Sequence, residues 1–105
     1  MTRPEDSLAW QLEYENIAFE REYRAIPGRR FRWDFRIGDI LIEVQGGTWA
    51  DSRSGHSTGA GIKRDCEKLN LATLHGWRVL AFTTDMVYQG EAIEQIKACL
   101  EKETN

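Results

Sequence analysis

The chain has 105 residues, of which 41% are hydrophobic and 30% are charged, and its formal net charge is −3. This composition is typical of a globular protein and excludes a disordered chain, so we expect one domain over residues 1–105. No apolar run approaches the ~20 residues of a membrane span, and the N-terminus lacks the apolar core of a signal peptide. We therefore predict a cytoplasmic protein with no membrane partner.

Periodicity and turn residues divide the chain into helices and strands. Apolar residues recur at helical spacing in three segments, whereas apolar and charged residues alternate in three strand-like segments. Trp77–Phe82 is nearly all apolar, which is typical of a strand buried on both faces. Gly38-Asp39 between two alternating segments predicts a two-residue hairpin turn. In chain order we predict a helix over 5–16, strands over 19–25, 31–37 and 40–45, a helix over 60–75, a strand over 77–82 and a helix over 90–102.

The order of these elements predicts an α/β fold with a mixed sheet. The two strands of the hairpin must be antiparallel. The strand–helix–strand step that follows requires a right-handed crossover, which makes the last two strands parallel neighbours. We therefore expect a central mixed sheet of about four strands flanked by helices.

Two carboxylates are predicted to face each other across the hairpin. With Gly38-Asp39 as the turn, Asp34 pairs with Glu43, and the Cβ atoms of such a pair are ~5 Å apart. Like charges at this spacing are destabilising unless a cation lies between them or one is protonated. Because Mg²⁺ binds one or two carboxylates together with water and phosphate, the pair predicts a metal site. The alternative is that both side chains point to water, and a one-residue slip in register would separate them.

Basic residues concentrate in the middle of the chain, between acidic ends. This distribution permits a surface that faces phosphates, and it is equally compatible with a solvated charged surface that has no partner. Contacts to the nucleic-acid backbone position a substrate without reading its sequence, and we find no base-reading element. The candidates for such backbone contacts are Arg29, Arg30, Arg32, Arg53, Lys63 and Arg64.

Several short motifs carry a resemblance to a known family: RFRWDF, DILIEVQGGTW, GHSTGAG, DCEKLN and GWRVL. From about residue 5 to residue 87 the chain resembles the small stand-alone PD-(D/E)XK nucleases of phage and prophage genomes. The resemblance implies a restriction-endonuclease-like core, in agreement with the predicted elements. It also implies an endodeoxyribonuclease that depends on Mg²⁺, with Mn²⁺ as a substitute, and that cuts DNA nonspecifically or according to its structure.

The resemblance implies roles for four residues of the hairpin and the following helix. Asp34 and Glu43 resemble the two metal-binding carboxylates. Gln45 stands where the motif usually has a lysine, and glutamine cannot supply that positive charge. Lys68 on the following helix is the candidate replacement, and the alternative is a solvated helix lysine.

The resemblance extends to residues outside the hairpin. Glu5 resembles the glutamate that the first helix often adds to the site, with Glu13 as the other candidate, although an acidic residue near a helix start also suits the helix dipole. His56 lies where the family has a histidine, which implies contact with the attacking water or the phosphate; the alternative is a polar surface residue. Asp65 and Asn70 match the helix pattern, and they equally suit a role in capping or bracing the loop.

Two other functions stay open. The chain could be a nuclease-derived DNA-binding or interaction module without catalysis, which Gln45 favours and the intact carboxylate pair disfavours. It could also be a subunit that needs a larger partner for targeting. Because so small a domain offers little footprint on DNA, we expect a homodimer.

Overall fold

The computed structural model describes residues 2–45 and 59–102 of the chain. Its elements, in chain order, are α1 (Pro4–Tyr14), β1 (Glu20–Tyr23), β2 (Trp33–Ile37), β3 (Ile40–Gln45), α3 (Gly59–Leu74), β4 (Arg78–Thr83), α4 (Thr84–Tyr88) and α5 (Glu91–Glu101). Every predicted helix and strand is present, with ends within two residues of those predicted. None of the helices in these two ranges has the length and apolar character needed to cross a bilayer.

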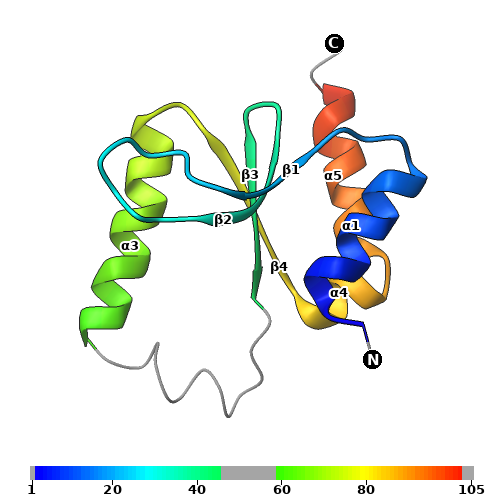
Figure 1. Ribbon diagram of the computed structural model, residues 1–105, viewed down its shortest axis with the longest axis horizontal. Helices are drawn as coiled ribbons and strands as arrows, with labels where there is room; N and C mark the ends of the chain where they lie inside the picture. The colour runs from blue at the N-terminus through cyan, green and yellow to red at the C-terminus, as the bar shows by residue number, and fades with distance from the viewer. Residues whose placement is uncertain (1, 46–58, 103–105) are drawn as a thin grey trace.

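The four strands form one mixed sheet in the order β1-β2-β3-β4. β1 and β3 both run antiparallel to β2, whereas β3 and β4 are parallel. Helix α3 lies on one side of this sheet, and α1, α4 and α5 lie on the other (Figure 1). The predicted fold, a mixed sheet of four strands flanked by helices, is therefore confirmed.

The β2–β3 hairpin has the predicted register. Ile37 pairs with Ile40, and Phe35 pairs with Ile42. Gly38 has a φ of +59°, a conformation that side-chain-bearing residues rarely adopt and that a two-residue turn requires at this position. The turn residues therefore set which side chains of the two strands lie together.

The sequence patterns did not predict helix α4. Thr83 caps its start, because the Thr83 Oγ1 accepts a hydrogen bond of 3.2 Å from the backbone N–H of Met86. The helix has only five residues, too few for a helical period to show in the sequence. Its Val87 is fully buried, so the helix adds to the core between α1 and α5.

The apolar sequence of strand β4 predicted burial on both faces, and this prediction is wrong. Phe82 is buried, but Ala81 is exposed and Val79 is only partly buried. The physical reason is that β4 is an outer strand of the sheet and α3 covers its face incompletely: Ala72 is the buried residue of α3, whereas Leu69 is 52% exposed. The sheet face beneath α3 is therefore partly open.

Candidate active site

Asp34 and Glu43 lie together where strands β2 and β3 stop pairing. The ladder between the strands ends at Phe35 and Ile42, one residue before the two carboxylates. Asp34 Oδ2 accepts a hydrogen bond of 2.7 Å from the backbone N–H of Val44. Both carboxylates line one cavity on the side of the sheet that α3 covers. The predicted hairpin thus brings the two acidic side chains together.

The backbone of β1 is distorted beside this pair. Glu22 lies opposite Asp34, between residues that pair with β2 on either side. It has a φ of +51°, a left-handed conformation that costs roughly 1–2 kcal/mol in a residue with a side chain. Strain of this kind often occurs at functional sites, and the Glu22 side chain lines the same cavity as Asp34.

Lys68, from α3, makes three contacts at the site. Its Nζ donates a hydrogen bond of 2.6 Å to Glu43 Oε2 and another of 2.7 Å to the backbone carbonyl of Arg32. The same Nζ lies 4.7 Å from the centroid of the Trp33 ring, within the range of a cation–π contact. The side chain is only 17% exposed, so Lys68 is not a solvated surface lysine.

Burial and like charge both act on the two carboxylates. The pKa of Asp34 is raised, first by burial and further by the charge of Glu5, while the Val44 N–H and Lys68 oppose the shift. The pKa of Glu43 is also raised by burial and by the charge of Asp34, against the opposing effect of Lys68. Lys68 is hydrogen-bonded to Glu43 and acts on Asp34 through its charge, and a divalent cation would relieve the remaining repulsion between the two desolvated acids.

The donor chemistry of the pair suits a hard divalent cation. Mg²⁺ and Mn²⁺ prefer oxygen ligands, and Mg²⁺ usually keeps several waters while binding one or two carboxylates. Asp34 and Glu43 supply such oxygens from adjacent strands, at the wall of an open cavity. Among the residues that the structure describes, no group of three or more His, Cys, Asp or Glu side chains forms a metal-binding cluster.

The carboxylate cavity has a volume of about 360 Å³ and carries arginines along its walls. Arg32 is one of them, and it is already ion-paired with Glu22 at 2.6 Å. Arg30 and Arg64 also line the cavity, and neither forms an ion pair within residues 2–45 and 59–102. These two guanidinium groups are therefore available to an anionic ligand.

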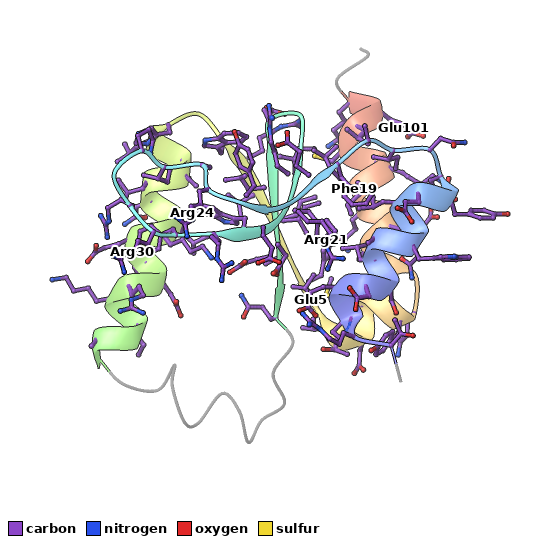
Figure 2. All side chains as sticks on the ribbon, viewed as in Figure 1. Glu5, Phe19, Arg21, Arg24, Arg30 and Glu101 are labelled. Carbon is purple, nitrogen blue, oxygen red and sulfur yellow. The ribbon has the colours of Figure 1, made fainter. Side chains whose placement is uncertain are left out.

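Glu5 lies in the first turn of α1 and does not line the carboxylate cavity. It is ion-paired with Arg3 at 2.9 Å, and its negative charge acts on Asp34. Figure 2 labels Glu5 on α1 and Arg21 on β1, and Arg21 is ion-paired at 3.0 Å with Asp6, the residue that follows Glu5. Glu13, the other candidate, is near the opposite end of α1. The structure thus favours Glu5 over Glu13 as the neighbour of the carboxylate pair.

Asp65, another predicted residue, lines the carboxylate cavity, whereas three of the described candidates do not. Gln45 lines a neighbouring cavity and not the one that contains Asp34. Arg29 is ion-paired with a glutamate of α3 at 2.9 Å. Lys63 is exposed and lines neither of these cavities. His56 and Arg53 fall outside the described residues.

Besides Glu22, two contributors to the site were not predicted from the sequence. Arg21 is ion-paired with Asp6 at 3.0 Å, and its charge acts on Asp34. Trp33 provides the ring beneath Lys68. The alternating sequence predicted that both residues lie on strands. Their contacts with α1 and α3 could not be predicted, because a local pattern contains no information about other elements of the fold.

The arrangement of sheet and helices is that of an α+β domain with a four-stranded mixed sheet. The solved structure of the homing endonuclease I-Bth0305I catalytic domain is similar to this chain, with a TM-score of 0.66 and 24% sequence identity. The similarity covers 97% of this chain and 93% of that one, and at this level of identity it shows the fold. Comparison with protein-family models gives no match, and neither does comparison with curated proteins.

Proposed function

We propose that the protein is a metal-dependent DNA endonuclease of the PD-(D/E)XK type. The observation that carries this proposal is the pair formed by Asp34 and Glu43, two partly buried acids in a cavity with arginine walls, where Lys68 is bonded to Glu43. A metal-dependent nuclease needs such a group of charges to hold a cation next to a phosphate. The name of the structural neighbour, a homing endonuclease, supports DNA as the substrate class.

In this proposal Asp34 and Glu43 hold Mg²⁺ or Mn²⁺. The bound ion would offset charge on the phosphate and lower the pKa of a bound water. The chain orients both ligands before any ion binds: the Val44 N–H holds the Asp34 carboxylate, and Lys68 holds that of Glu43. Ligands fixed in this way bind with less loss of side-chain freedom.

Lys68 takes the place of the motif lysine that Gln45 cannot supply. Its ammonium group lies at the carboxylate pair and lines the same cavity, whereas Gln45 lines the neighbouring one. A positive charge fixed here, partly screened from water, stabilises the charge that develops on a phosphate undergoing attack. Glu5 acts as a further acid that tunes Asp34.

Basic residues beside the pair bind the DNA backbone. Arg30 and Arg64 contact the phosphates that flank the scissile one, since both line the cavity and are available for an anion. Such contacts position the substrate and carry no sequence information. From the sequence alone, His56 is assigned to the attacking water or the phosphate, and Arg53 to a backbone contact.

A second candidate function is a DNA-binding module without catalysis. The absence of a lysine at the Gln45 position favours it. In this case the arginines would still bind DNA, but no phosphodiester bond would be broken. A homodimer would serve either function by enlarging the DNA footprint. Sedimentation of the protein with and without DNA measures its oligomeric state.

The experiment that separates these functions is cleavage of a panel of labelled DNAs: duplex, single strand, flap and four-way junction. Each is incubated with Mg²⁺, Mn²⁺ or EDTA. We expect metal-dependent products from the natural protein and from Asp85→Asn, a matched control at an exposed position of helix α4, but none from Asp34→Asn. DNA binding without cleavage by the natural protein would establish the non-catalytic module instead.

A further inference from the structure

A second cavity adjoins the carboxylate cavity on the side of strand β4. We call it the β4 recess. It has a volume of about 270 Å³, slightly below the usual range for small-molecule sites. The two cavities are neighbours, because they share four lining residues: Trp33, Glu43, Asp65 and Lys68. A group in the recess would therefore lie directly beside the proposed reaction centre.

The side of the β4 recess that faces away from the carboxylate cavity is mostly apolar. Leu69 from α3 is 52% exposed there, above Val79 and Ala81 of β4. Gln45 adds an amide group to the lining, and this amide can both donate and accept hydrogen bonds. Beyond Glu43, Asp65 and Lys68, which the recess shares with the carboxylate cavity, its lining combines apolar side chains with this one amide. That combination matches a nucleobase, which has apolar faces and an edge of donors and acceptors.

On its other side, the carboxylate cavity continues into a cavity of about 510 Å³ with a cationic lining. The two share Arg30, Phe31 and Arg64. Arg29 lies over the Phe31 ring, with its guanidinium carbon 4.6 Å from the ring centroid. The molecule thus presents, in order, a cationic surface, an acidic pair with its lysine, and an apolar recess.

This order of charges matches one strand of nucleic acid. Phosphates fit the cationic surface, the scissile phosphate fits the metal-binding pair, and an uncharged base fits the β4 recess. A base stacked inside a continuous duplex cannot enter a recess of this kind without leaving the stack, which costs a few kcal/mol. The cost is smallest for a nucleotide that has no pairing partner.

We propose that the β4 recess holds an unpaired nucleobase next to the scissile phosphate, so that the protein prefers DNA containing an unpaired nucleotide over continuous duplex. This inference rests on the proposed nuclease function for the kind of ligand. Its binding step, however, is measurable without metal and without cleavage. Gln45 contacts the edge of the base, which gives this residue a role other than that of the missing lysine.

The test uses a DNA duplex in which one strand carries a single bulged 2-aminopurine, compared with the same duplex fully paired, in EDTA. We expect the bulged DNA to bind about ten-fold more tightly, equivalent to burying roughly one aliphatic side chain's worth of apolar surface. The emission of 2-aminopurine should also change on binding. Equal affinity for the two DNAs, or unchanged emission, would overturn the proposal.

Variants locate the binding site. Ala81→Trp fills the recess and should lower the affinity for bulged DNA to that for paired DNA, whereas Ala98→Trp, at an exposed position of α5, should leave it unchanged. Leu69→Ala removes one wall without filling the space, and should weaken binding of bulged DNA alone. If Ala81→Trp does not fold, Leu69→Ala still decides. A full preference for bulged DNA in Leu69→Ala would overturn the assignment to the recess.

The outcome also separates this inference from the nuclease proposal. Tight binding of bulged DNA with no cleavage in Mg²⁺ would leave the recess in place and contradict the nuclease. Metal-dependent cleavage of paired and bulged DNA at equal rates would leave the nuclease in place and contradict the recess.

Discussion

The two faces of the sheet differ in how completely they are packed. On the side of α1, α4 and α5, eleven buried residues form one core. On the side of α3, four buried residues form a second cluster, and beside it lie Asp34, Glu43 and Lys68. A closely packed face cannot admit a substrate, and an open face contributes less buried apolar surface. The comparison teaches that one face of the sheet supplies most of the buried core, whereas the other face carries the residues of the proposed chemistry.

The largest expected effect comes from a cavity on the packed face. Phe35 is fully buried, so Phe35→Ala should lower the free energy of unfolding by about 3–5 kcal/mol. Leu69→Ala, on the α3 side, should change it by no more than roughly 0.5 kcal/mol, because Leu69 is 52% exposed. Urea titration followed by circular dichroism measures both. Similar losses for the two variants would contradict the division between the faces.

The second-largest effect is on the rate of cleavage, with the fold left intact. Lys68→Met keeps most of the aliphatic stem but removes the charge at Glu43, and should slow single-turnover cleavage about 100-fold. The matched variant is Lys97→Met on α5, where the lysine makes surface ion pairs of 3.4 and 3.7 Å; its cleavage rate should be unchanged. A Lys68→Met enzyme of full activity would show that another group supplies the charge.

The third effect, smaller in free energy than the two above, is a rise in melting temperature when metal binds. At a Mg²⁺ concentration ten times its Kd, the stabilisation is about 1.4 kcal/mol, or roughly 6–11 °C for a domain of this size. Asp34→Asn should abolish this shift, whereas Asp85→Asn should retain it. Equal shifts in Asp34→Asn and the natural protein would place the ion elsewhere.

The smallest effect is the dependence of stability on pH without metal. Because folding raises the pKa of both Asp34 and Glu43, the folded state binds more protons than the unfolded state between the unfolded and folded pKa values. This contribution to stability is fully present below the unfolded pKa values and is lost as pH rises through the folded ones. Glu43→Gln should reduce the loss in urea titrations across this range. An unchanged slope in Glu43→Gln would contradict the raised pKa of Glu43.

Local patterns predicted the hairpin and its carboxylates because the information is contained in adjacent residues. The turn at Gly38 sets the register, and the register brings Asp34 and Glu43 together at the end of the β2–β3 ladder. The partners of Lys68 were less accessible to prediction. Its contacts with Trp33 and the Arg32 carbonyl depend on how α3 lies over the sheet, which periodicity does not report.

Burial was predicted less well than secondary structure. The apolar sequence of β4 indicated a strand covered on both faces, yet Ala81 is exposed because α3 covers that face incompletely. Helix propensity and apolar spacing specify that α3 forms, but not how closely it packs. For the same reason the β4 recess, and the place of Gln45 in its lining, could not be inferred from the sequence.

The measurement that tests the central claim most directly is a crystal structure of the protein grown with Mn²⁺, with data collected at the manganese absorption edge. We predict an anomalous peak bound by carboxylate oxygens of both Asp34 and Glu43, with Lys68 still lining the site. The same data from Asp34→Asn crystals should lack the peak. A manganese ion bound elsewhere, or no peak between these two carboxylates at a concentration that supports cleavage, would contradict the account.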